Sequence, residues 1–146
     1  MTNITFTIPG PPQGKARPRV VRTKYGRSMS FTPDKTVAYE ELVRARYAVA
    51  PHPEVPLQGP VCVSIVASYP IPASTSKKRH AEMLAGMDYP AKKPDWDNIG
   101  KIICDALNGI AYRDDAQVIF AQVEKRYAEF PCVKVRIWEV HNDARS

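Results

Sequence analysis

The chain has 146 residues, which suits one domain with a hydrophobic core and is too short for two. Apolar residues make up 44% and charged residues 25%, as in ordinary globular proteins, and no apolar run approaches the ~20 residues of a membrane span. The N-terminus lacks the pattern of a signal peptide. We therefore expect one cytoplasmic domain over residues 1–146 with no membrane partner. The formal net charge of +6 favours an anionic partner, most commonly nucleic acid.

The first half of the chain alternates extended and helical patterns. Residues 4–8 alternate apolar and polar side chains and predict a strand, and residues 61–71 predict a second, rich in β-branched residues. Between them, residues 9–33 are basic and rich in turn residues, with a short hairpin expected around Tyr25. Residues 34–50 begin with an aspartate and predict an amphipathic helix. That helix should bury its apolar residues Val37, Leu42 and Val43.

The second half contains the clearest helical pattern. Residues 74–86 predict a short helix that ends at a glycine, and residues 95–109 predict a longer helix with Asp95 at its N-cap position. Residues 116–130 and 132–140 alternate like two paired strands. The apolar residues expected on the core side of the longer helix are Trp96, Ile99, Ile102, Ile103, Ala106 and Leu107.

The order of these elements indicates the fold class. A succession of strand, helix, strand, helix, helix, strand and strand favours one mixed sheet with helices packed on it. We expect an α+β fold, a single small domain with a mixed β-sheet of about four strands. The three cysteines, Cys62, Cys104 and Cys132, lie far apart in apolar runs. Their odd number argues against a disulfide framework, so we expect buried reduced thiols.

Carboxylates gather in the stretch 92–118, in a chain with an excess of positive charge. Asp97, Lys101 and Asp105 are spaced by four residues and share one stripe of the predicted helix. That stripe could be a solvated face with two ion pairs, each worth ~0.3–0.5 kcal/mol. Asp95 could simply cap the helix.

Two further observations favour a catalytic interpretation of the same stretch. Asp95 lies one residue from Asp97, and the pair Asp114-Asp115 directly precedes a predicted strand. Converging carboxylates repel unless they share a cation, and carboxylate oxygens without His or Cys suit Mg²⁺ or Mn²⁺. With Lys101 directed at the same centre, the pattern indicates metal-assisted phosphodiester cleavage, in which the lysine stabilises an oxyanion or the leaving group.

Positive charge surrounds this acidic stretch. Residues 14–27 carry six cations and no acidic residue, and Tyr25 and Phe31 are interleaved where they could stack on bases or sugars. The run could be a solvated loop, or it could hold a polyanion by its backbone. The candidate DNA-binding residues are Lys15, Arg17, Arg19, Arg22, Lys24, Arg27, Lys77, Lys78, Lys92 and Lys93.

Several blocks of the sequence together resemble the RusA family of Holliday junction resolvases. They are K-A-R-P-R in the first loop, K-P-D-W-D-N-I-G-K, D-A-L-N-G and D-D-A-Q-V. The resemblance spans nearly the whole chain and is most specific over residues 92–118. It implies a metal-dependent endonuclease of DNA recombination and repair that acts as a homodimer on four-way junction DNA. Its cofactor would be Mg²⁺, with Mn²⁺ as an alternative. Small resolvases of this type are common in prophages, which favours a phage role.

The resemblance also implies roles for individual residues. The catalytic, metal-holding carboxylates would be Asp95, Asp97 and Asp115, and the essential lysine would be Lys101. Asp105 and Asp114 match family positions as supporting residues, with Asp105 orienting the lysine.

Trp96 departs from the aliphatic residue that the family pattern leads us to expect between the two aspartates. We expect it in the core, where it could alter how the aspartates are presented.

Two symmetric nicks on opposed strands match the twofold symmetry of a dimer with two identical sites. Two other functions are open on the sequence. One is a non-catalytic protein that binds branched or single-stranded DNA, with aspartates that only cap and pair. The other is a metal-dependent hydrolase of nucleotides or RNA.

Overall fold

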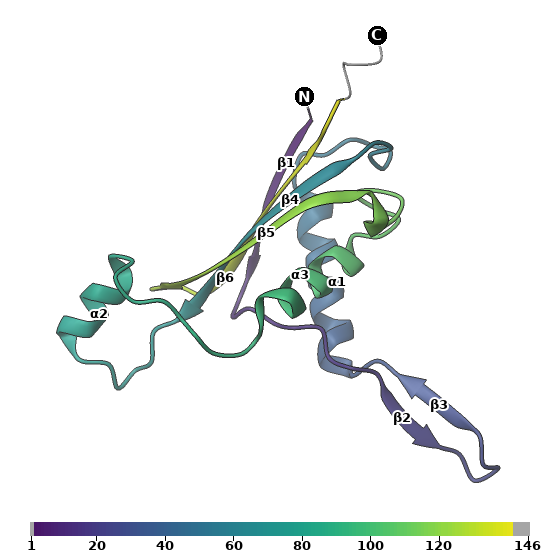
Figure 1. The fold of residues 1–146 in the computed structure, drawn as a ribbon, viewed down its shortest axis with the longest axis horizontal. Coiled ribbons are helices and arrows are strands. Elements are labelled where there is room, and N and C mark those ends of the chain that lie inside the picture. The colour runs from purple at the N-terminus through teal and green to yellow at the C-terminus, as the bar shows by residue number, and fades with distance from the viewer. Residues whose placement is uncertain (1, 142–146) are drawn as a thin grey trace.

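The computed structural model describes residues 2–141 and is built on a four-stranded mixed sheet. Its strands are β1 (Asn3–Pro9), β4 (Val61–Pro70), β5 (Val118–Ala128) and β6 (Cys132–Glu139), in the spatial order β1-β6-β4-β5. β6 runs antiparallel to both of its neighbours, whereas β4 and β5 are parallel (Figure 1). The expected α+β class and mixed sheet are confirmed.

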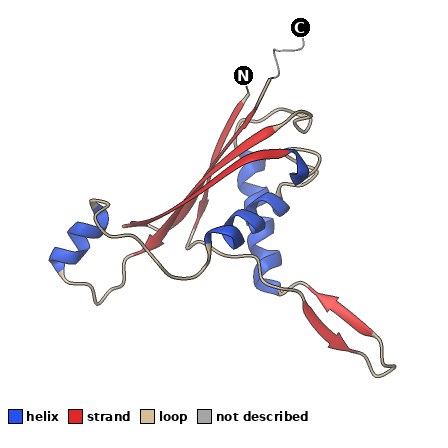
Figure 2. Cartoon of the chain, in the orientation of Figure 1, coloured by secondary structure: helices blue, strands red, loops and turns tan. Residues whose placement is uncertain are grey.

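Two helices, α1 (Asp34–Val49) and α3 (Trp96–Ala106), lie on one face of this sheet (Figure 2). Side chains alternate across a strand, so Ile4, Phe6 and Ile8 of β1 all point into the core between sheet and helices. The short helix α2 (Lys77–Leu84) lies apart from this layer, near the end of β5. Among residues 2–141, no helix is both long and apolar enough to cross a bilayer.

Helix α1 buries a different stripe from the one expected. Its buried apolar residues are Tyr39, Val43 and Tyr47, which are spaced by four residues and face the sheet. Val37 is 38% exposed, because a six-residue offset from Val43 places it well away from that stripe. Leu42 lies at the core margin. The helix was correctly predicted, but Val37 was wrongly assigned to the core.

The last two strands are not paired with each other, contrary to the prediction. β4 lies between them and pairs with both, so that Ser68 has Arg126 of β5 on one side and Cys132 of β6 on the other. The connection after Ala128 passes the end of β4 and returns as β6 on its far side. The alternation of apolar and polar residues predicted each strand correctly. It did not predict which strands are neighbours, because strand pairing depends on contacts between residues distant in sequence.

The basic N-terminal segment forms the expected hairpin, of β2 (Arg19–Arg22) and β3 (Ser28–Phe31). The turn closes through Thr23 N to Arg27 O at 2.7 Å, and Gly26 adopts φ +75°, a conformation that favours glycine. Figure 1 shows this hairpin extending away from the sheet and helices as a separate arm.

The three cysteines carry no disulfide, as expected. Cys62 is buried, whereas Cys104 and Cys132 are only half-buried.

Candidate active site

The site begins at the N-terminus of α3, where Asp95 occupies the N-cap position. Its side chain accepts no capping hydrogen bond and is 52% exposed, with Lys93 Nζ at 3.7 Å from Oδ2. An N-cap aspartate normally binds the free amides of the first turn. Since this carboxylate does not do so, it is available to a ligand.

Three of the predicted site residues line one shallow cavity of about 280 Å³, formed between α3 and β5: Asp97, Lys101 and Asp115. Asp97 also lines a neighbouring cavity of about 460 Å³, together with Asp95 and Lys125. Asp97 therefore connects the two cavities, and all four predicted catalytic residues border one or the other.

Asp105 is the centre of an ion-pair network behind this cavity. Its Oδ2 lies 3.3 Å from Lys101 Nζ, one turn earlier on α3, and 3.4 Å from Lys15 Nζ in the first loop. Lys15 Nζ in turn donates to Glu40 Oε1 of α1 at 3.0 Å. With side-chain exposures of 19% for Asp105 and 12% for Glu40, these pairs are partly shielded from water. The network holds the carboxylate that sits beside the lysine.

A close backbone approach brings Lys15 to this position. Lys15 N donates to Asn98 O at 3.0 Å, and a Cβ on Gly14 would lie 2.9 Å from Pro94 Cβ. Only glycine permits this contact, so the first loop can reach the start of α3.

Asp115 lies opposite α3, at the start of a short 3₁₀ turn, η1 (Asp115–Gln117). Burial raises the pKa of its carboxyl, as do hydrogen bonding with Asp105 and the charges of Asp105 and Asp114, while Lys101 acts in the opposite direction. The negative charges of Asp105 and Asp114 thus disfavour the charged form of Asp115. A bound cation would offset that effect.

Asp114 has a different task from its neighbour. Its Oδ2 accepts from Ala116 N at 3.0 Å, and Gln117 Oε1 accepts from Asp114 N at 3.1 Å, which together form a capping box. Gln117 Nε2 also donates to Leu57 O and Gly59 O at 2.9 and 2.8 Å. Asp114 therefore fixes the turn that presents Asp115.

Cys104 also lines the smaller cavity, next to the carboxylates. Burial, and to a lesser extent the charges of Asp115 and Asp105, raise the pKa of this thiol to about 11, although a hydrogen bond with Tyr112 acts the other way. The thiol stays protonated at neutral pH, so it is no nucleophile.

Within residues 2–141, no group of three His, Cys, Asp or Glu side chains is arranged to hold a metal ion. The predicted ligands Asp95, Asp97 and Asp115 instead lie around two adjoining cavities. Their chemistry still suits a hard cation, since all are carboxylates and Asp115 is destabilised as an anion. The donor set fits Mg²⁺ or Mn²⁺.

Trp96 was wrongly assigned to the core. It is 64% exposed and lines both cavities beside Asp97. The periodicity of α3 would bury it with Ile99 and Ile103, but Trp96 is the first residue of the helix and projects past the core. The indole is instead part of the surface around the carboxylates.

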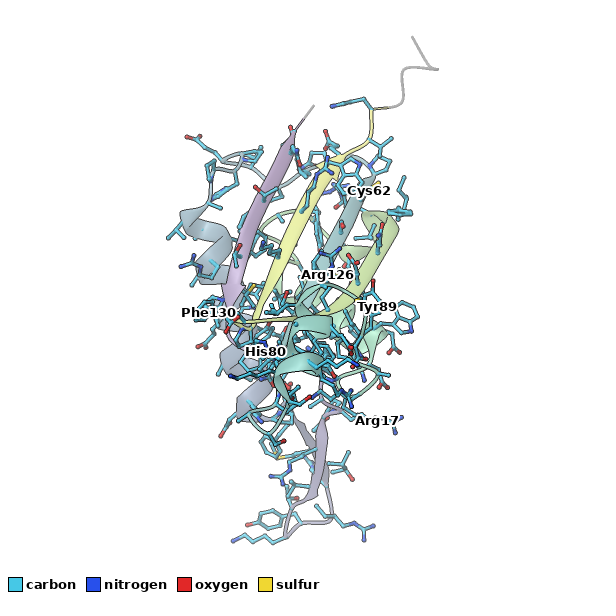
Figure 3. All side chains as sticks on the ribbon, turned by 90° about the vertical axis from the view of Figure 1, so that its left-hand side faces the viewer. Arg17, Cys62, His80, Tyr89, Arg126 and Phe130 are labelled. Carbon is cyan, nitrogen blue, oxygen red and sulfur yellow. The ribbon has the colours of Figure 1, made fainter. Side chains whose placement is uncertain are left out.

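The candidate DNA-binding residues fall into separate groups. Lys15 belongs to the ion-pair network. Figure 3 shows Arg17 beside the start of the hairpin arm, where it is exposed. Lys93 lies next to Asp95, and Lys92 Nζ lies 5.8 Å from the centre of the Tyr127 ring. Six further candidates are exposed. Arg19, Arg22, Lys24 and Arg27 lie on the arm, and Lys77 and Lys78 lie in the first turn of α2.

Sequence reasoning missed two residues of this region, Glu40 and Lys125. Lys125 lines the larger cavity, its Nζ donates to Lys92 O, and it lies 5.2 Å from the centre of the Tyr69 ring. Glu40 stands on α1, 25 residues from its partner Lys15. Neither residue belongs to a local motif, so only the tertiary structure reveals them.

The fold and site define a small α+β protein with clustered carboxylates and a lysine between a helix and a sheet edge. A sequence model of the RusA endodeoxyribonuclease family matches residues 9–138. The chain is also 37% identical over 142 residues to the uncharacterized protein YqaN of Bacillus subtilis (strain 168), covering 96% of this chain and 99% of that protein. The chain belongs to the RusA family, whose members are divalent-metal-dependent nucleases of the Holliday junction resolvase class.

Proposed function

We propose that this protein is a structure-selective endonuclease that resolves Holliday junctions by paired symmetric nicks, in DNA recombination and repair. The observation that carries the proposal is the shared cavity of Asp97, Lys101 and Asp115, in a chain of the RusA family. The unit that acts is the whole chain, residues 1–146. It works in the cytoplasm, where its DNA substrate lies, and serves a resident prophage.

The carboxylates Asp95, Asp97 and Asp115 would hold the metal, Mg²⁺ or alternatively Mn²⁺. When bound, the cation supplies an activated water and neutralises charge that develops on the phosphate. Asp95 is free of capping bonds, and the pKa of Asp115 is raised by burial and by Asp105, so both have reason to accept a cation. Asp114 contributes indirectly, by fixing the turn that carries Asp115.

Lys101 is the group that meets the phosphate. Its side chain is 61% exposed, so its ammonium can reach a substrate, and Asp105 at 3.3 Å orients it. There it would stabilise the negative charge of the transition state or of the leaving oxygen. Electrostatic stabilisation of this kind is the largest contribution to rate enhancement in many enzymes. Lys15 and Glu40 hold Asp105 in turn, and so act on Lys101 through it.

Symmetry argues for a homodimer. One chain carries one carboxylate cluster, whereas resolution requires two nicks related by the twofold axis of the junction. A dimer would supply both sites to the same junction.

The alternative is a non-catalytic DNA-binding protein whose aspartates only pair and cap. A cleavage assay on a synthetic four-way junction separates the two functions. We expect cleavage by the wild type in Mg²⁺ and none in EDTA. Asp97→Asn and Asp115→Asn should lower the cleavage rate at least ~10²-fold while junction binding survives. The control is Asp88→Asn, whose aspartate pairs with Arg79 outside both cavities. Unchanged cleavage in the site variants would refute this assignment.

A further inference from the structure

The β2–β3 arm carries an apolar face that stays about half exposed within residues 2–141. Arg19 pairs with Phe31 and Val21 with Met29, and directly paired residues project to the same side of a hairpin. Val21, Met29 and Phe31 therefore form one patch, and they are 47, 48 and 45% exposed. An isolated two-stranded hairpin is at best marginally stable in water. Such a face calls for a partner that buries it.

The charge of the arm indicates what that partner is. Residues 9–33 contain six Lys and Arg and no acidic residue. Arg19 shares the face of the patch, Arg22 projects to the opposite face, and Lys24 and Arg27 flank the tip. There Tyr25 is 81% exposed, with Lys24 Nζ at 5.3 Å from its ring centre. With cations and no carboxylate along this segment, the arm would be attracted by a polyanion. Charge complementarity favours nucleic acid.

We propose that the arm packs its apolar face against base pairs exposed at the branch point of the junction. This inference rests on the proposed function, since it names the part of the substrate that the arm recognises. An intact duplex hides its base-pair faces inside the stack and offers mainly phosphates and base edges. At a branch point the stack is interrupted, so flat apolar surfaces are open to Met29 and Phe31, as they are to the wedge residues of DNA-bending proteins. The flanking cations hold the adjacent phosphates.

Two multiple variants separate the apolar from the electrostatic contribution. The first is Met29→Ser with Phe31→Ser; the second is Arg22→Gln with Lys24→Gln and Arg27→Gln. The matched control is Met87→Ser with Phe130→Ser, which removes a Met and a Phe that are 74% and 81% exposed outside the arm. Affinities for a four-way junction and for a linear duplex are measured by fluorescence anisotropy in EDTA over a series of KCl concentrations.

The apolar variant should lose its preference for the junction over the duplex by about tenfold, with an unchanged salt dependence. The charge variant should weaken binding to both DNAs and reduce the slope of log K against log salt by about 2–3. A 2-aminopurine base at the branch point should change its fluorescence with wild type and control, but not with the apolar variant. Circular dichroism should show all variants folded, because the arm lies outside the core.

An unchanged junction preference and 2-aminopurine signal in the apolar variant would overturn the proposal. It would also be overturned if the wild type did not prefer the junction, or if the apolar variant lost only its dimeric state in sedimentation, which would identify a second chain as the occupant. Because binding is measured without metal, a failure of cleavage in Mg²⁺ would refute the proposed nuclease and leave the arm's role standing.

Discussion

At the scale of single residues, the site has two features. Lys101 is held by an ion pair with Asp105, and the Asp115 carboxylate lies close to other negative charges. Lys101 and Lys15 both approach Asp105 Oδ2, at 3.3 and 3.4 Å. Asp115 lies close enough to Asp105 for its pKa to rise. Two neighbouring aspartates, Asp114 and Asp115, thus have opposite effects: one satisfies a backbone amide, and the other carries an unfavourable charge.

If Lys101 has the proposed role, Lys101→Ala should lower the single-turnover cleavage rate about 10²–10³-fold, because the lysine would stabilise charge that is present only in the transition state. Its effect on the dissociation constant for the junction should stay within about threefold, since one surface cation is a small part of a large charged interface. Rates at saturating enzyme and binding in EDTA provide the two numbers. Lys35→Ala, which changes an exposed lysine of the first turn of α1 outside both cavities, is the control. If binding fell in step with cleavage, the lysine would be a phosphate anchor instead.

Asp115→Asn should stabilise the folded protein at neutral pH. The folded-state pKa of this carboxyl is raised above its ordinary value of 3.8, so the folded state is penalised once pH rises through that range and not below it. The variant should therefore have a higher melting temperature than wild type at pH 7, and the difference should vanish at pH values below 3.8.

The measurement is thermal unfolding across pH, with and without Mg²⁺. Added Mg²⁺ should raise the melting temperature of the wild type more than that of the variant. Asp88→Asn serves as the control and should gain nothing at pH 7, because Asp88 pairs with Arg79 outside both cavities. A lower melting temperature for Asp115→Asn than for wild type at pH 7 would show that the charge of Asp115 does not destabilise the folded protein.

At the scale of elements, α1 packs its stripe of Tyr39, Val43 and Tyr47 against β1 and α3. Tyr47 is 1% exposed, and its ring meets Phe6 edge-on at 5.8 Å and stacks on His52 at 4.4 Å. Its hydroxyl has no hydrogen-bond partner among the described residues. The Tyr47 ring thus stabilises the folded protein through its packing, whereas its unpaired buried hydroxyl destabilises the folded protein.

Tyr47→Phe should therefore raise the free energy of unfolding by about 1 kcal/mol, because it removes an unsatisfied buried group. Tyr112→Phe is the matched comparison, since the buried Tyr112 hydroxyl donates to Cys104 O at 2.7 Å. That change should lower the free energy by about 1–3 kcal/mol. Urea unfolding of both variants measures whether each change raises or lowers the free energy of unfolding. Destabilisation of similar size in both would show that the Tyr47 hydroxyl is satisfied.

Sequence patterns predicted the individual helices and strands better than the contacts between them. The apolar spacing of α3 and the alternation of β6 are local properties, so both elements were predicted correctly. The separation of β5 from β6 by β4 was not predicted, because strand order is decided by contacts across the whole sheet. Trp96 shows the same limit. Helical periodicity predicts which side of the helix faces the core, but it does not predict where along the helix the core ends, and Trp96 lies beyond that point.

The candidate site was partly predictable for the same reason. Asp97, Lys101 and Asp105 share a stripe of one helix, and the structure does place Lys101 beside Asp105. The pairing of Asp105 with Lys15, and of Lys15 with Glu40, joins three segments and had no signal in the sequence.

At the scale of the whole molecule, the basic hairpin arm is separate in space from the carboxylate site. Asp97 and Asp115 line the cavity between α3 and β5. The β2–β3 arm, which has cations and no acidic residue, extends away from the sheet and helices (Figure 1). One chain therefore has a surface that attracts a polyanion and a separate place where a cation can act on it. In a symmetric dimer, two arms and two sites would face the same four-way junction.

The most direct measurement is the single-turnover cleavage of a four-way junction labelled on each strand, with linear duplex and RNA of matched sequence in parallel. We expect Mg²⁺-dependent nicks at symmetric positions on two opposed strands, no comparable cleavage of duplex or RNA, and loss of both nicks in Asp97→Asn. Equal cleavage of junction and RNA, or junction cleavage that persists in Asp97→Asn, would contradict the account.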